Sequence, residues 1–525
     1  MTDVETFDQA SLEAFTSELV VAGFEPEPDT NRRFWKGPIH PAFEDLTDAT
    51  RMRIRLRDGW PFVFPVLYVD GLHTNHLTED GFVCMWHEGV ISDEWLTAEG
   101  FLGRIDDWCD KAKHGWDEAG LARDAYLNFT DKHVAVASYD LDELRTDNHG
   151  SWGAFHATAR TQLHLLLGPG TGQAGDLNGL WFHVGSVQVP PRNLGEIRNQ
   201  LSTAQRKGLD RAIGQRKRGD VLAPSGGVDL AMFRWDRGTN RHLLVLALEG
   251  VDSSVAATAL QDGPIDEQSL LLRAGPDAAT LRDKSVVIFG LGALGGHAAV
   301  CLASSGIGRL RLVDSDQVLP GNVVRHVSGH RAVGAGKVHA VEVAIEDHAP
   351  WTVVETVIER PRTPTRLAEL VQDLDLVVDA TATPAITAAL ASLSTSYGVP
   401  VVSAALYRGG RIARVQRQGI SGDVAIPARV ADDRYRQIPP GPEEEDLAEP
   451  AVGCSAPVNN APPSSALACA GLLCEVAIDM LTERCDFPDE ITDVYRALDD
   501  EPPYDRLGRV RDTDSAVPQA AAAMS

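Results

Sequence analysis

A glycine-rich turn between a strand and a helix constrains the fold of this chain more than any other segment. The apolar run at 285–289 predicts a buried strand, and Gly290, Gly292 and Gly295 follow it in G-x-G-x-x-G spacing. Glycines here let the backbone approach a phosphate, and the N-terminus of the next helix favours anions. The segment predicts a nucleotide site on a doubly wound fold, and by itself it fits any dinucleotide-binding protein.

Apolar runs of strand length alternate with helix-like segments after residue 274. This alternation predicts a parallel sheet with helices on both faces, so we expect residues 274–498 to form a Rossmann-like α/β domain with a mostly parallel sheet. The proline-rich, acidic run 438–465 is predicted to be a crossover loop. We expect an apolar helix at 466–481 and a disordered tail at 499–525.

Residues 1–118 predict a compact α+β domain. An amphipathic helix is expected at 8–23, and a half-buried strand at 51–57, where apolar residues alternate with arginines. An apolar run follows at 62–69, and a second helix is expected at 101–111.

Residues 130–265 predict a central α+β region. Helices are expected at 153–167 and 194–215, and the segments 180–189 and 242–250 are typical of strands. We find no motif that carries chemistry in this region. It is therefore interpreted as a linker or docking domain, and its role stays open.

The composition excludes some classes of partner. The formal net charge is −27, from 48 Lys and Arg against 75 Asp and Glu, which argues against a nucleic-acid footprint. The sequence lacks an uninterrupted apolar stretch of some 18 residues and a signal-peptide pattern at its start, so we expect a cytoplasmic protein without a membrane segment. The seven cysteines show no paired metal spacing.

A set of polar residues follows the glycine turn and favours adenylation over redox chemistry. Adenylation needs cations on a triphosphate and a carboxylate for magnesium, whereas a NAD enzyme needs no such set near the second strand. The candidates are Asp314, Asp316, Asn322, Arg325, Lys337 and Asp379.

Residues 281–481 resemble the ThiF superfamily, which includes molybdopterin-synthase-type adenylyltransferases and ubiquitin-activating enzymes. The resemblance rests on the glycines together with the D-x-D, N-x-x-R and Lys pattern. It implies ATP and Mg²⁺ as cofactors, with Asp314 on the ribose and Asp379 on magnesium. It further implies phosphate contacts for the set Asn322, Arg325 and Lys337. The family usually has glutamine after the arginine, where this chain has His326.

Two cysteines lie in segments suited to expose a thiol. Cys454 lies in the predicted crossover loop, where members of this superfamily that act beyond the adenylate hold a catalytic cysteine. Cys84 follows Trp60-Pro61-Phe62, Asn75 and a Gly-Phe-Val turn. This order resembles the core of ubiquitin-conjugating enzymes over most of the first 115 residues. It implies that Cys84 carries a thioester and that Asn75 stabilises the oxyanion.

The combined hypothesis is a fused activating and conjugating enzyme, similar to those of bacterial antiviral and ubiquitin-like operons. It would adenylate the C-terminal carboxylate of a ubiquitin-like or other partner protein, relay the acyl group from Cys454 to Cys84, and join it to an amine on an acceptor protein. The resemblance implies a homodimer through the adenylation domain.

Three alternatives stay open. A sulfur-carrier adenylyltransferase explains Gly290 to Asp379 but leaves the Trp60 to Cys84 segment without a function. A first domain that only binds a charged partner would make Cys84 inert. A NAD dehydrogenase would bind nicotinamide cofactor without ATP.

Overall fold

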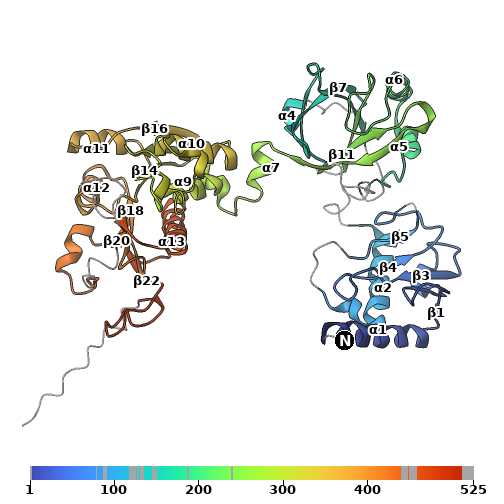
Figure 1. Cartoon of the computed structure of the whole chain (residues 1–525), viewed down its shortest axis with the longest axis horizontal. Helices are drawn as coiled ribbons and strands as arrows, with labels where there is room; N and C mark the ends of the chain where they lie inside the picture. Colours follow the sequence, from blue (N-terminus) through green and yellow to red (C-terminus); the bar gives the residue numbers. More distant parts are fainter. Residues whose placement is uncertain are drawn as a thin grey trace, which may run out of the picture. The chain divides into compact units, whose positions relative to one another are not determined.

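The computed structural model describes residues 3–78, 80–86, 92–116, 126, 129, 135–144, 150–185, 189–237, 240–438, 447–448 and 458–510. The chain divides into two compact units, Met1–Asp266 and Glu267–Ser525. The first unit holds two separate sheets and the second holds one large sheet (Figure 1). We describe each part by itself.

The N-terminal part packs two helices against a five-stranded antiparallel sheet in the order β1-β2-β3-β4-β5. Its elements are α1 (Asp3–Val21), β1 (Glu25–Pro26), β2 (Phe34–Pro38), β3 (Arg51–Arg55), β4 (Val66–Tyr68), β5 (Phe82–Val83) and α2 (Ala98–His114). Met52 and Ile54 of β3 are buried while its arginines are exposed. This alternation confirms the predicted half-buried strand and the α+β class.

The central part is an eight-stranded mixed sheet in the order β12-β11-β10-β9-β7-β8-β6-β13. Its strands are β6 (Val136–Tyr139), β7 (Trp152–Thr161), β8 (His164–Pro169), β9 (Leu177–Gly185), β10 (Leu230–Arg237), β11 (Asn240–Glu249), β12 (Ala256–Ala259) and β13 (Gln261–Pro264). Helices α5 (Leu194–Gln200) and α6 (Thr203–Ile213) confirm the predicted helical segment at 194–215. They bury Ile197 and Leu209 against Phe182 and Phe233 of the sheet.

The predicted helix at 153–167 is wrong. This segment forms the hairpin of β7 and β8, in which Ala157 pairs with Leu167. Phe155 and Ala157 point into the core two residues apart, so the apolar pattern has the period of a strand. A run of small and apolar residues of this length fits either period, and pairing with β9 decides between them.

The second unit contains a sheet in the order β16-β15-β14-β17-β18-β19-β22-β23. The first five strands are parallel and the last three add antiparallel neighbours, which confirms the mostly parallel, doubly wound sheet. The strands are β14 (Ser285–Phe289), β15 (Arg309–Val313), β16 (Val353–Val357), β17 (Leu376–Asp379), β18 (Val401–Tyr407), β19 (Ile412–Gln418), β22 (Glu490–Val494) and β23 (Gly508–Arg509).

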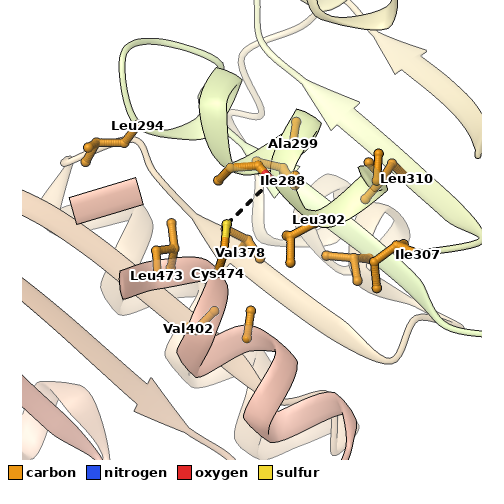
Figure 2. Close-up of a cluster of buried hydrophobic side chains, with 14 of the residues drawn as sticks. Ile288, Leu294, Ala299, Leu302, Ile307, Leu310, Val378, Val402, Leu473 and Cys474 are labelled. Carbon is orange, nitrogen blue, oxygen red and sulfur yellow. Dashed lines mark hydrogen bonds between the residues drawn. The ribbon is translucent and has the colours of Figure 1, made fainter. Parts of the chain in front are cut away.

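Helices cover both faces of this sheet. Val286 and Ile288 of β14 pack toward α9 (Gly295–Ser304), α10 (Lys337–His348) and α13 (Pro463–Leu481). Val287 and Phe289, which alternate with them, pack toward α11 (Pro364–Val371) and α12 (Pro384–Tyr397). Figure 2 shows part of the first cluster, in which Leu302 of α9 and Leu473 of α13 are both buried. Strands buried on both faces explain the continuous apolar runs in the sequence.

Helix α13 confirms the apolar helix predicted at 466–481. It is the one helix in the described part of the chain that is long and apolar enough to cross a membrane, and 61% of its most apolar window is buried inside the protein. Asp479 on this helix is buried and paired with Arg417 of β19. We therefore assign α13 to the core of the sheet domain.

The predicted tail begins later than expected. Residues 499–510 are folded, because Gly508 and Arg509 pair with β22 and Tyr504 is buried against Ile412 and Leu498. The polar composition of 499–510 did not indicate this contact, because Tyr504 is the one buried aromatic residue of the segment. Most of the predicted crossover loop lies outside the described residues, which include the paired strands β20 (Leu447–Ala448) and β21 (Val458–Asn459).

Candidate active site

A cavity of about 310 Å³ opens at the carboxyl ends of β14, β15 and β17. The chain proceeds from β14 to β15 and β16 on one side, and returns to β17 and β18 on the other side of β14. Ligands of doubly wound sheets bind at this switch point. Its walls include the predicted residues Gly290, Gly292, Asp314, Asp316 and Lys337.

The glycine turn forms one wall of the cavity. Gly290 has φ +82°, a left-handed conformation that suits glycine. A Cβ on Gly295 would lie 1.8 Å from the Gly290 carbonyl oxygen, so only glycine allows α9 to begin this close to β14. A Cβ on Gly292 would meet no described atom within 4 Å. The three glycines therefore serve two tasks, because Gly290 and Gly295 shape the turn and Gly292 leaves room for a ligand.

Asp314 supports the turn and also faces the cavity. Its two carboxylate oxygens accept hydrogen bonds from the Leu291 amide at 2.7 Å and the Asp316 amide at 2.8 Å. An ionised carboxylate has about four acceptor positions, so each oxygen retains capacity for a further donor. This arrangement fits the ribose hydroxyls predicted for Asp314.

Lys337 supplies a cation at the cavity. It is the first residue of α10, and its Nζ lies 2.8 Å from Asp316 Oδ2. The Lys337 amide also donates to the Asp316 carbonyl at 2.8 Å. Only 13% of the Lys337 side chain is exposed, against 65% of Asp316. Asp316 thus holds the Lys337 ammonium at the cavity. Because Asp316 is largely exposed, water can solvate its carboxylate when the ion pair separates.

Asn322 and Arg325 are engaged elsewhere. Asn322 Oδ1 accepts from the Leu319 amide at 2.9 Å and so closes its own short turn. Arg325 Nη1 donates to the carbonyls of Asn459, at 2.5 Å, and Ala461, at 3.1 Å. The structure therefore places Arg325 on the segment that leads into α13, and its predicted phosphate contact would require the guanidinium to turn.

Asp379 ends β17 and is fully buried. Its carboxylate accepts hydrogen bonds from the hydroxyls of Thr381 at 2.7 Å, Thr387 at 2.5 Å and Ser403 at 3.1 Å, and from the Thr381 amide. These donors fill the acceptor positions that magnesium would need. The magnesium role stays a prediction, and this geometry argues against it. In the described structure Asp379 fixes the turn whose residues Ala380 and Thr381 line the cavity.

His326 ties the glycine turn to the segment before α10. Its Nε2 donates to the Leu291 carbonyl at 2.8 Å and its Nδ1 accepts from the Ser328 amide at 3.1 Å, which fixes the neutral tautomer. Burial lowers the pKa of His326 below its usual value, although the bond to Leu291 opposes this shift. The one sign of this role in the sequence is that histidine replaces the glutamine usual in the family.

Residues that follow β16 in the chain form a further wall of the cavity, and they were not predicted from the sequence. Glu359, Arg360 and Pro361 line it together with Leu367 and Ile386. Both Glu359 oxygens accept from the Arg366 guanidinium, at 2.7 and 3.2 Å. No local motif marks these residues, because their role depends on where β16 ends beside β15.

Cys84 lies beside Asn75 in the N-terminal part. The Cys84 amide donates to the His76 carbonyl at 2.9 Å, and Leu77 forms a bridge with Val83. Cys84 is half-buried and its Sγ donates to the Trp86 carbonyl at 3.5 Å. The structure thus brings the two predicted residues into adjacent backbone segments. Asn75 is buried.

Two aromatic residues close this part of the fold. The Trp95 indole donates to the Pro61 carbonyl at 3.0 Å. The Trp116 ring lies 4.2 Å from the His76 ring, and its Nε1 contacts Thr74 Oγ1 at 3.4 Å.

The second predicted catalytic thiol, Cys454, lies outside the described residues.

Comparison with known families agrees with this site. Residues 267–484 match the model of the ThiF family. The match covers less than half of the chain, so these residues are similar to that family. The mostly parallel sheet and the glycine turn agree with the Rossmann-like fold expected for residues 274–498, and the adenylation role stays a prediction.

Several proteins are similar to parts of this chain. The protein y4qC of Sinorhizobium fredii is 34% identical over 197 residues, which are 32% of this chain and 34% of that protein. The adenylyltransferase and sulfurtransferase uba4 of Emericella nidulans is 37% identical over 130 residues, 24% and 27% of the two chains. The ATP-dependent ubiquitin transferase-like protein Cap2 of Pseudomonas aeruginosa is 27% identical over 256 residues, 46% and 44% of the two chains. The matched part thus spans between a quarter and a half of these relatives.

The lowered pKa of His326 predicts a pH dependence of stability. Because the folded domain favours neutral His326, its contribution is complete above about pH 6.5, the unfolded value, and is lost as the pH falls through the lower folded pKa. The stability difference between the wild type and His326→Gln should therefore shrink from pH 7 to pH 5 in thermal unfolding.

The exposed His339 on α10, which lies 3.1 Å from Glu342, provides the comparison, because His339→Gln reports what the loss of a surface histidine does to the same pH profile. A difference between wild type and His326→Gln that is constant with pH would contradict the structural role of the neutral imidazole.

Proposed function

We propose that the ThiF-family domain uses ATP to adenylate the C-terminal carboxylate of a partner protein. The observation that carries this proposal is the cavity at the switch point, where a glycine turn, a carboxylate and a lysine converge. The ThiF match supports adenylation over nicotinamide chemistry. The relatives named as an adenylyltransferase and as an ATP-dependent ubiquitin transferase-like protein point to the same class of reaction.

The residues of the cavity would divide the work on the nucleotide. The glycine turn and the N-terminus of α9 would hold phosphate oxygens through backbone amides. Asp314 would accept from the ribose hydroxyls with its remaining lone pairs. Lys337 would leave Asp316 and neutralise phosphate charge, which stabilises the crowded phosphorus during displacement. Bound ATP supplies an α-phosphorus that a carboxylate oxygen attacks, with pyrophosphate as the leaving group.

Magnesium does not fit at Asp379 in the described arrangement. Its carboxylate is saturated by hydroxyl and amide donors, and the described residues contain no cluster of three or more His, Cys, Asp or Glu side chains suited to a metal. Asp314 and Asp316 line the cavity together with Lys337, and Glu359 lines it as a partner of Arg366.

The proposed continuation is a thioester relay. The Cys454 thiolate would attack the acyl carbon with AMP as leaving group, and the Cys84 thiolate would then attack the thioester and release Cys454. An amine of an acceptor protein would finally attack the Cys84 thioester to form an amide. The half-buried thiol beside Asn75 and the similarity to Cap2 support this relay.

Asn75 would donate from its side-chain amide to the oxyanion of the last step.

From the resemblance of the sequence, we further propose that the activity belongs to bacterial antiviral defence. The partner would be a ubiquitin-like protein, and the adenylation domain would form a homodimer.

A sulfur-carrier adenylyltransferase is the second candidate. The similarity to uba4, whose name combines adenylyl transfer with sulfur transfer, favours it. In that case the first domain would serve as a binding module and Cys84 would carry no acyl group. The two candidates share the nucleotide site and differ in the use of Cys84.

Substituting Lys337 tests the nucleotide site. Lys337→Ala should weaken ATP binding by about 10- to 100-fold in calorimetry of the full chain, since a hydrogen bond to a charged group contributes about 1.5–3 kcal/mol. Lys284→Ala is the matched control, because Lys284 lies just before β14, at the amino ends of the same strands, and pairs with Asp375. Equal ATP affinity in both variants would contradict the assignment.

An amine trap tests the relay. Cys84→Lys should convert the transient thioester into a stable amide, and mass spectrometry of the protein from its own host should find a partner C-terminal peptide at position 84. His73→Lys, at an exposed position of the same segment, should carry no adduct. The adduct should disappear when Lys337→Ala is added.

The two candidate functions give different results in this trap. A Cys84→Lys protein that still binds ATP yet carries no adduct would exclude the relay and favour the sulfur-carrier activity. An adduct that survives Lys337→Ala would show that the acyl group comes from another enzyme.

A further inference from the structure

Two cysteines outside the proposed relay lie on helices that pack against each other, α9 and α13. Cys301 lies on α9 and is exposed, whereas Cys474 lies on α13 and is buried. Figure 2 shows Cys474 directed toward α9, where its Sγ donates to the Ala298 carbonyl at 3.7 Å. Ala298 precedes Cys301 on α9 by three residues, so the Cys474 thiol lies against the helical turn that carries Cys301.

The two thiols differ in their chemistry. Hydrogen bonding from Cys474 lowers the pKa of Cys301 to about 7, although burial opposes this shift and Ser305 supports it. The same contact, together with burial, raises the pKa of Cys474. Burial, with a further contribution from the charge of Asp493, raises the pKa of Cys469, also on α13, to about 12. A thiolate that solvent reaches is the form that reacts with electrophiles, and a pKa of about 7 leaves a substantial fraction of Cys301 as thiolate at neutral pH.

We propose that Cys301 and Cys474 are a redox-active thiol pair, which a hydroperoxide oxidises to a disulfide between α9 and α13. The Cys301 thiolate attacks one peroxide oxygen, so that an S–O bond forms and the O–O bond breaks. The other oxygen leaves after protonation as an alcohol, or as water when the oxidant is hydrogen peroxide. The Cys474 sulfur then attacks the Cys301 sulfur, an S–S bond forms, the S–O bond breaks and the hydroxyl leaves as water with the Cys474 proton. Each peroxide accepts two electrons, and two thiols become one disulfide.

The position of the pair gives the disulfide a consequence. Helix α9 begins in the glycine turn at Gly295, and α13 follows the segment that Arg325 holds through Asn459 and Ala461. A covalent link between these helices would tie the nucleotide turn to the segment that leads out of the predicted crossover loop. The disulfide would therefore restrict movement of the glycine turn at Gly295 relative to the segment of Asn459 and Ala461 that leads into α13.

Peroxide treatment of the full chain tests the proposal without any measurement of adenylation. Hydrogen peroxide near equal molarity should produce a loss of 2 Da, a peptide pair linked through Cys301 and Cys474, and full reversal by dithiothreitol. In Cys474→Ala the sulfenic acid on Cys301 should persist and be trapped by dimedone, several-fold faster than on the half-buried Cys485.

Cys469→Ala is the matched control, because Cys469 is a buried cysteine on the same helix. The link should survive Cys469→Ala and be lost in Cys474→Ala and in Cys301→Ser, whose exposed position tolerates the change. A link that persists in Cys474→Ala would overturn the assignment of the partner. Dimedone labelling of Cys301 no faster than of Cys485 would overturn the reactive thiol.

Discussion

The close approach of α9 to the first strand of the sheet is the contact on which the site depends. A single methyl group on Gly295 would collide with the Gly290 carbonyl, so the sequence must hold glycine there for the helix to begin at the strand end. This approach aims the helix N-terminus at the cavity and seats Leu302 in the core. His326 and Asp314 then fasten the same turn from two sides, through Leu291. The start of α9 and the shape of the cavity wall therefore both depend on the close approach of Gly295 to Gly290.

The balance of charge at the cavity follows from the same arrangement. Lys337 is held by Asp316, an exposed carboxylate for which solvent is a nearly equivalent partner. Exchange of Asp316 for a phosphate therefore costs little free energy, while the ammonium gains a more highly charged partner. Asp379 contrasts with it, because four donors hold its buried carboxylate and exchange there would leave several polar groups unpaired. This contrast supports the proposed ligand role of Lys337, while Asp379 holds the turn after β17.

The sequence predicted the elements whose signal is local. A continuous apolar run predicted β14, the glycine spacing predicted the turn, and the arginine alternation predicted β3. It failed at 153–167, where the apolar pattern fits two periods and only pairing with β9 selects the strand. It also missed Glu359 and Arg360, whose place at the cavity depends on a strand order that no local pattern encodes. The directions of Asn322, Arg325 and Asp379 likewise follow from tertiary hydrogen bonds.

Hydrogen–deuterium exchange of the full chain with and without ATP tests whether this cavity binds ATP. Bound ATP should slow exchange in the segments that converge on the cavity, 290–296, 314–316, 335–338 and 380–386, and NAD should not. Unchanged exchange in these segments with saturating ATP, or slowing by NAD instead, would contradict the assignment of this cavity as an ATP site.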